Sequence, residues 1–255
     1  MSDAADMFRL DGEVALITGG GTGLGLAMAR RMAGAGGRVV ITGRREEVLR
    51  GAVAEIGGGT EYIVHDVTQL GEAASLVGQV TERFGAPTIL VNNAGINLKK
   101  ICTETSDEDF ERIMRTNVTG AFALSRAAAA GMAERRRGSI LFIASMASLF
   151  GIPGVVAYSA AKTAILGMVR TMAVDLSPRG VRVNAIAPGW IDSAMLRKAF
   201  DGDPARRDRI LARTPMGDVG QPDDVAWAAV YLCSPAARFV TGAVLPVDGG
   251  VSIGF

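Results

Sequence analysis

Short runs of apolar residues recur along this chain, and a stretch of helical length follows almost every run. Apolar runs of this length are typical of strands buried on both faces, and strands that alternate with helices form parallel sheets. The pattern predicts a single α/β domain over residues 1–255, with a Rossmann-type, doubly wound parallel sheet of seven strands and helices on both faces. The predicted strands are Val14–Thr18, Arg38–Thr42, Tyr62–Val64, Ile89–Val91, Ser139–Ile143, Val181–Ile186 and Val244–Val247.

In most of the segments between these strands, the apolar residues recur at the spacing of a helix. The predicted helices are Gly23–Ala35, Arg45–Ile56, Leu70–Phe84, Asp107–Arg136, Tyr158–Leu176 and Pro222–Leu232. Trp190–Gly220 shows no clear period and follows a predicted strand, which is where a long irregular segment is often a lid over a site. We therefore expect a substrate lid over about residues 190–220.

Charge and composition exclude several classes of protein. The chain has 27 Lys and Arg against 26 Asp and Glu, and this net charge of +1 lacks the basic excess of a nucleic-acid-binding protein. Cys102, Cys233 and the single histidine, His65, are too few for a zinc cluster, so we expect no metal. Because neither a secretory signal nor a membrane span is evident, we expect a cytoplasmic protein with reduced cysteines and a half-buried, structural His65.

A glycine-rich loop joins the first predicted strand to the first predicted helix. Glycine lets the backbone turn sharply and approach a ligand without a clash from Cβ. The first turn of a helix offers free N–H groups and a positive dipole end to a diphosphate. A tight turn alone would also explain the glycines. The position near the N-terminus favours dinucleotide binding by Gly19, Thr22, Gly23, Leu24 and Gly25.

Further motifs follow this loop in a fixed order. The glycine spacing is TGxxxGxG, and after it come Asn92-Asn93-Ala94-Gly95, Tyr158 with Lys162, Pro188-Gly189 and Asp248-Gly249-Gly250. In these motifs the sequence resembles the short-chain dehydrogenase/reductase family, of ordinary length, over nearly the whole chain. The resemblance implies a nicotinamide-dependent oxidoreductase that acts on CH–OH groups and assembles as a homotetramer.

The spacing of Tyr158 and Lys162 carries the expected chemistry. They lie four positions apart, so they share one face of a predicted helix. A phenol with a pKa of about 10 is a poor base at neutral pH, but a nearby ammonium lowers that pKa. We predict that Lys162 lowers the pKa of Tyr158, which exchanges a proton with the substrate. The resemblance assigns Ser145 as the catalytic serine that holds a substrate oxygen, and Asn117 as the residue that holds a water in a proton relay.

The resemblance also implies contacts with the cofactor along the whole chain. Asp66 matches an aspartate that contacts adenine, Ala94 and Gly95 line the adenosine ribose, and Ser193 stands where the family usually has threonine. Beyond the glycine loop, the implied cofactor residues are Arg44, Asp66, Val67, Asn93, Ala94, Gly95, Tyr158, Lys162, Pro188, Gly189, Ile191 and Ser193.

The end of the second predicted strand favours NADP over NAD. NAD-specific proteins carry an acidic residue there, which binds the 2′-hydroxyl of the ribose, whereas this chain has Gly43. Arg44, and with it Arg45, can pair with a 2′-phosphate. The alternative is that these arginines pair with neighbouring glutamates, and Thr22 stands where many NADP enzymes of the family carry a basic residue. We predict a preference for NADP(H).

We expect the substrate to be a secondary alcohol or ketone, and three interpretations of the function stay open. The stretch Asn97–Lys100 resembles sugar-acid dehydrogenases such as gluconate 5-dehydrogenases, while the overall resemblance to 3-oxoacyl-carrier-protein reductases is nearly as good. A non-catalytic nucleotide-binding regulator is the alternative from another class. Lys99 and Lys100, with Ser145, are the expected substrate contacts, and an anionic substrate is favoured if they face the cleft. The expected lid also contains basic residues, whose positive charge neighbouring acids could cancel. They are Arg197, Lys198, Arg206, Arg207 and Arg209.

Two apolar segments are the expected contact surfaces of the homotetramer. The first is the alanine-rich helix face of Ala127–Ala133. The second is the C-terminal tail, Val251–Phe255.

Overall fold

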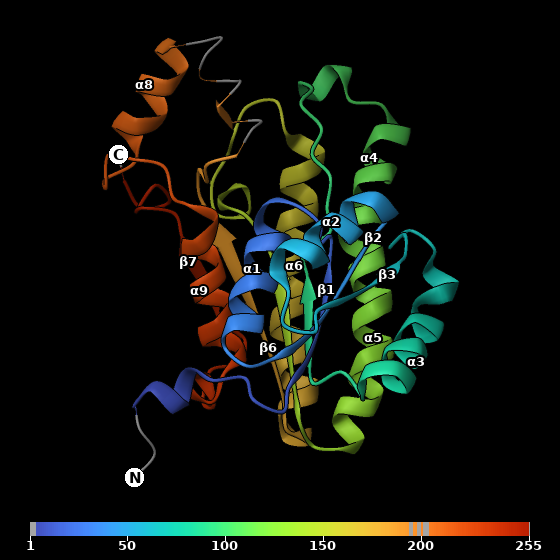
Figure 1. The fold of residues 1–255 in the computed structure, drawn as a ribbon. Coiled ribbons are helices and arrows are strands. Elements are labelled where there is room, and N and C mark those ends of the chain that lie inside the picture. The colour runs from blue at the N-terminus through green and yellow to red at the C-terminus, as the bar shows by residue number, and fades with distance from the viewer. Residues whose placement is uncertain (1–3, 194–195, 198–199, 201–203, 255) are drawn as a thin grey trace.

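A single parallel sheet organises the chain, and its strand order reverses next to β1 (Figure 1). The computed structural model describes residues 4–193, 196–197, 200 and 204–254. The seven strands are ordered β3-β2-β1-β4-β5-β6-β7, and every neighbouring pair is parallel, which confirms the predicted fold class. Their bounds are β1 Val14–Thr18, β2 Arg38–Gly43, β3 Glu61–Val64, β4 Ile89–Asn92, β5 Gly138–Ile143, β6 Val181–Pro188 and β7 Val244–Val247.

The helices follow the predicted positions, with two differences. Their bounds are α1 Gly23–Gly34, α2 Glu46–Ile56, α3 Ala73–Phe84, α4 Asp107–Met114, α5 Gly120–Glu134, α6 Val156–Leu176, α8 Pro204–Arg213 and α9 Pro222–Cys233. The single helix predicted over Asp107–Arg136 is wrong in detail, because a π-helical turn, Arg115–Thr119, separates α4 from α5. The expected lid also contains a helix, α8, that its sequence period did not indicate.

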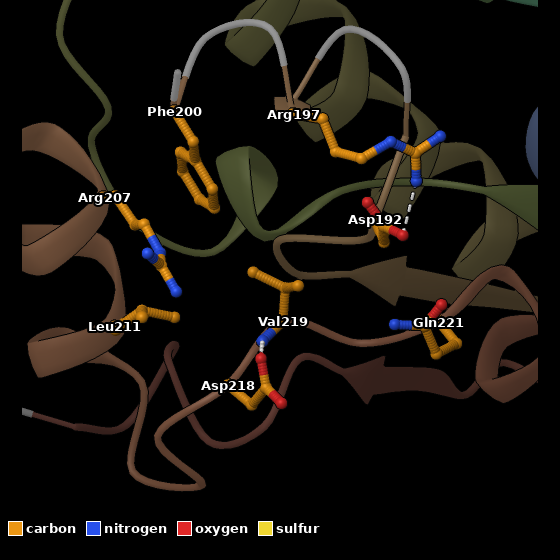
Figure 2. Close-up of a pocket in the computed structure, with 8 residues that line it drawn as sticks. All are labelled: Asp192, Arg197, Phe200, Arg207, Leu211, Asp218, Val219 and Gln221. Atoms are coloured by element: carbon orange, nitrogen blue, oxygen red, sulfur yellow. Dashed lines mark hydrogen bonds and ion pairs between the residues drawn. The ribbon is translucent and has the colours of Figure 1, made fainter. Parts of the chain in front are cut away.

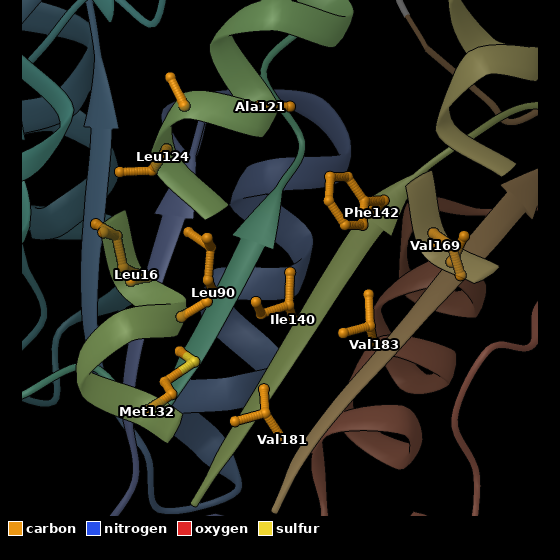
Figure 3. Close-up of a cluster of buried hydrophobic side chains, with 14 of the residues drawn as sticks. Leu16, Leu90, Ala121, Leu124, Met132, Ile140, Phe142, Val169, Val181 and Val183 are labelled. Atoms are coloured by element: carbon orange, nitrogen blue, oxygen red, sulfur yellow. The ribbon is translucent and has the colours of Figure 1, made fainter. Parts of the chain in front are cut away.

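Apolar residues on alternate strand positions form two cores, one on each face of the sheet. On one face, Leu16, Leu90 and Phe142 pack against Leu124 and Met132 of α5 (Figure 3). Successive strand residues point to opposite faces, so Ile17 and its neighbours pack on the other face against α1, α2 and α9. Figure 1 shows α3 and α5 on one side and α1 and α9 on the other.

The two cysteines and the histidine, to which no catalytic role was given, lie in different environments. Cys233 is buried, and burial raises the pKa of its thiol to about 11, whereas Cys102 is an exposed free thiol. His65 is buried, and burial lowers its pKa. Within the described ranges, no group of three or more His, Cys, Asp or Glu side chains is placed to hold a metal ion. No helix there is long and apolar enough to cross a membrane.

Candidate active site

The glycine loop lies at the reversal of strand order, where α/β sheets bind ligands beyond the carboxyl ends of their strands. Thr22 is the N-cap of α1 and makes no side-chain cap bond, which leaves the first helical N–H groups without that partner. Gly23 has φ +55°, and the space where its Cβ would stand is open. A Cβ on Gly25 would lie 2.2 Å from the carbonyl oxygen of Gly19, so only glycine fits there. The loop therefore offers a diphosphate a cradle of backbone N–H groups.

Asn93 ties this loop to the segment that follows β4. Its Nδ2 donates to the carbonyl oxygens of Thr18 and Gly19 at 2.9 and 3.1 Å. In return, Thr18 Oγ1 accepts from the backbone N–H groups of Asn93 and Ala94, both at 3.0 Å. Asn93 thus acts on the cofactor cradle through the backbone of β1. The side chain of Asn92 instead donates to Ser125 Oγ of α5 at 2.8 Å.

Asp66 follows β3 and is fixed by the residue two positions on. Its Oδ1 accepts from both the backbone N–H and the hydroxyl of Thr68, each at 2.9 Å. Burial raises the pKa of Asp66, but the bonds from Thr68 and the charges of Arg44 and His65 outweigh it, so the pKa lies below its ordinary value. The carboxylate therefore stays ionised at neutral pH and is available to an amino group such as that of adenine.

The glutamates next to Arg44 and Arg45 bind another residue. Glu46 Oε1 and Glu47 Oε2 both pair with Arg50, each at 3.2 Å. Arg44 is exposed, and within the described ranges neither it nor Arg45 makes a side-chain hydrogen bond or ion pair. The alternative in which these arginines pair with their own glutamates is therefore wrong for this structure.

Ser145, Tyr158 and Lys162 meet at the carboxyl end of β5. The Tyr158 phenol lies close enough to the hydroxyl of Ser145, just beyond that strand, for Ser145 to lower its pKa. Lys162, one turn further along α6, is 5% exposed, and its Nζ donates to the carbonyl oxygen of Ile143 at 2.6 Å. The same Nζ lies 5.6 Å from the centre of the Tyr158 ring.

The predicted lowering of the Tyr158 pKa is not seen in this structure. Burial raises the pKa of the phenol, and Ser145 opposes that rise only in part. Burial also lowers the pKa of Lys162 to about 8. The ammonium is held on a backbone carbonyl rather than on the phenol, so its effect on Tyr158 is smaller than the helical spacing suggested.

Asn117 lies in the π-helical turn, and its side-chain amide is hydrogen-bonded to the segment that follows β4. Its Oδ1 accepts from the backbone N–H of Ile96, and its Nδ2 donates to the carbonyl oxygen of the same residue, both at 2.8 Å. A Cβ on Gly95 would lie 3.2 Å from Asn117 Oδ1 and 3.6 Å from Lys162 Nζ. Asn117, Gly95 and Lys162 are therefore close neighbours.

The segment after β6 is braced by the C-terminal part of the chain. Gly189 approaches Asp248 so closely that a Cβ would lie 2.6 Å from its Cα, and its N–H donates to Val247 at 2.9 Å. Ile191 forms a bridge with Gly220. The hydroxyl of Ser193 accepts from the backbone N–H of Leu196 at 3.1 Å, so it already has one partner.

The two lysines that were expected to contact substrate have different neighbours. Lys100 Nζ forms an ion pair with Asp109 Oδ2 at 2.6 Å, and Asp109 also binds Arg112. Lys99 is exposed and passes beside Gly154. Lys100 is therefore already paired with an acid of α4, whereas the contact of either lysine with substrate stays a prediction.

The expected lid borders a cavity of about 520 Å³ (Figure 2). Its lining residues are Asp192, Arg197, Phe200, Arg207, Leu211, Asp218, Val219 and Gln221, of which the sequence analysis had singled out only the two arginines. Lys198 lies outside the described residues, as does the side chain of Arg206. The end of α8 is tied back to the loop after Ser145, because the Arg213 guanidinium lies 4.3 Å from the centre of the Phe150 ring.

Fold and site together define a dinucleotide-binding oxidoreductase, and comparison with known proteins gives the family. The family model described as enoyl-(acyl carrier protein) reductase matches residues 19–252. This chain belongs to the short-chain dehydrogenase/reductase family. The prediction of an oxidoreductase that uses a nicotinamide dinucleotide and acts on CH–OH groups is thereby confirmed.

Three similar proteins illustrate the range of this family. The 2-(S)-hydroxypropyl-CoM dehydrogenase 3 of Xanthobacter autotrophicus is 40% identical over 96% of this chain and 98% of its own length. The 3-oxoacyl-acyl-carrier-protein reductase of Vibrio cholerae is 35% identical over 95% of this chain and 98% of its own length. The structure of a gluconate 5-dehydrogenase from Burkholderia cenocepacia in complex with NADP and tartrate matches with a TM-score of 0.93. It is 37% identical and covers 99% of this chain and 100% of that one.

Proposed function

We propose that this protein is an NADP(H)-dependent dehydrogenase of secondary alcohols, or a reductase of the matching ketones. The observation that carries the proposal is the proximity of the Tyr158 phenol and the Ser145 hydroxyl beside the buried Lys162. These three groups lie at the carboxyl end of β5, one strand from the reversal of strand order at which the glycine loop lies.

The residues around the glycine loop fit a dinucleotide. The first N–H groups of α1 and the open space beside Gly23 suit a diphosphate. Asp66 suits the adenine amino group, and Arg44 suits a 2′-phosphate because no glutamate neutralises it by direct pairing. When bound, the nicotinamide supplies or accepts the hydride and, in its oxidised form, places a positive charge near the phenol.

The side chains of the site divide the remaining chemistry among them. Ser145 holds the substrate oxygen, and Tyr158 donates a proton to that oxygen in reduction and removes it in oxidation. The buried Lys162 places positive charge near the phenol, which favours the phenolate. Asn117 fixes the backbone of Ile96 and stands next to Lys162, where it can hold a water that connects the ammonium to solvent.

Replacing the proton donor tests this assignment. Tyr158→Phe removes the hydroxyl and keeps the ring, so we expect kcat to fall by about 10²- to 10⁴-fold while the Kd of NADPH changes little. Tyr231→Phe on α9 is the matched control and keeps normal activity. If Tyr158→Phe stays within a few-fold of the unmodified turnover, the proposed mechanism is wrong.

For the substrate, we propose a keto-sugar acid or the corresponding hydroxy acid. The solved relative with 37% identity is a gluconate 5-dehydrogenase that binds NADP and tartrate, which supports this class. A 3-oxoacyl thioester is the second candidate, supported by the relative from Vibrio cholerae. Assay of keto-sugar acids, neutral ketones and an acetoacetyl thioester with NADPH and NADH separates these candidates.

We also propose a cytoplasmic homotetramer, with different contact surfaces from those first expected. Of the expected helix face Ala127–Ala133, the side chains of Ala128, Ala129 and Ala133 lie in the core of their own chain, whereas Ala130 is exposed. Of the tail, Val251 is buried and Phe255 lies outside the described residues. Large exposed apolar side chains instead include Phe110 of α4, Phe122 of α5, Trp227 of α9 and Phe239.

A further inference from the structure

One guanidinium at the cavity beside β6 has no partner in the described part of the chain. Arg197 Nη1 pairs with Asp192 Oδ2 at 2.6 Å, so its charge is balanced. Arg207, on α8, makes no hydrogen bond or ion pair to any described residue. Figure 2 shows its side chain reaching into the space between Phe200 and Val219. A cation in this position is available to a ligand.

The rest of the cavity wall suits a ligand rich in hydroxyl groups. Asp192 and Asp218 are hydrogen-bond acceptors, and Gln221 can both donate and accept. Asp218 binds only the N–H of Val219 among the described groups, at 2.7 Å. A simple carboxylate would meet repulsion from Asp218, whereas a hydroxy acid can donate a hydroxyl to it. The volume, about 520 Å³, leaves room for a six-carbon chain.

Two segments connect the cavity to parts of the chain that the proposed function uses. Asp192 follows Ile191, one of the residues that the family resemblance assigns to the cofactor. The far end of α8 is anchored to the loop after Ser145 through Arg213 and Phe150. A ligand in this cavity is therefore bounded on one side by the cofactor segment and on another by a helix tied to the catalytic loop.

We propose that Arg207 binds the carboxylate of a polyhydroxy acid substrate, while Asp218 accepts a hydrogen bond from one of its hydroxyls. The proposal rests on the proposed function and narrows it to substrates that carry both groups. It assigns the contact with the substrate anion to an arginine of the lid, whereas Lys100 is paired with Asp109.

The test compares 5-ketogluconate with fructose, a neutral ketose of the same length. In Arg207→Gln we expect kcat/KM for 5-ketogluconate to fall about 10- to 100-fold, mostly through KM, because one charge-assisted bond is lost. The value for fructose stays within about twofold. Arg207→Lys keeps part of the preference, since the charge remains without the fork geometry. The control is Arg209→Gln, exposed two residues further along α8, which behaves as the unmodified protein.

A calorimetric titration provides a readout that does not need turnover. Gluconate is titrated into Tyr158→Phe loaded with NADP⁺, with and without Arg207→Gln, and we expect the Kd to rise about 10-fold or more in the double variant. Equal Kd values, or equal losses for 5-ketogluconate and fructose, would overturn the proposal. If no ketone is reduced although NADPH binds, the proposed function fails instead, and the titration still decides the role of Arg207.

Discussion

At the scale of single residues, the burial of Lys162 makes stability depend on pH. Its pKa falls from 10.5 to about 8 in the folded chain, so between these values the unfolded chain binds more protons and stability rises with pH. The rise amounts to on the order of 3 kcal/mol. Lys162→Met lacks the buried ammonium, so its stability should not show this rise. The unfolding free energy of the unmodified protein, measured by urea denaturation, should therefore increase relative to that of Lys162→Met from pH 8 to 10.5. Parallel pH profiles for both proteins would refute this.

The proposed preference for NADP(H) rests on one residue, Arg44. Arg44→Ala should weaken NADPH binding about 10- to 100-fold and leave NADH within about twofold, because only NADPH carries the 2′-phosphate. Fluorescence titration gives both Kd values. Arg38→Ala, at the opposite end of β2, is the control and should alter neither. Equal affinities for both cofactors in the unmodified protein would contradict the preference.

At the scale of elements, the π-helical turn depends on Asn117. Its amide satisfies both the N–H and the carbonyl oxygen of Ile96, and its side chain is buried. Asn117→Ala leaves two backbone groups without these partners, so we expect a loss of about 2–5 kcal/mol in unfolding free energy together with a loss of activity. Thr116→Ala removes only a hydroxyl bond to Arg112 on the exposed side and should cost less than about 0.5 kcal/mol. A stability of Asn117→Ala equal to that of Thr116→Ala would exclude this role.

The strands could be predicted to within a residue or two, because buried parallel strands require the apolar runs from which they were recognised. The break between α4 and α5 could not, since it follows from the contact of Asn117 with Ile96, far along the chain. Helix α8 was missed because its charged sequence has no long apolar period. The pairing of Lys100 with Asp109 likewise depends on side-chain positions that spacing does not reveal.

At the scale of the whole molecule, we expect four chains of 26.5 kDa to associate. Phe110 and Phe122 leave apolar area exposed on α4 and α5, and burying it in a partner stabilises the assembly. Sedimentation at micromolar concentration should therefore give a tetramer, and Phe110→Asp with Phe122→Asp should give a smaller, still folded species by circular dichroism. A monomeric unmodified protein would rule out this assembly.

The central claim is hydride transfer to a carbonyl carbon, with Tyr158 as the proton donor. It is tested most directly with NADPH that carries deuterium at both C4 positions and a panel of keto-sugar acids and ketones. Mass spectrometry should find one deuterium on the carbinol carbon of the product from the unmodified protein. Tyr158→Phe, which still binds NADPH, should give almost none. Bound NADPH without labelled product from any ketone would contradict the claim and favour a non-catalytic nucleotide-binding protein.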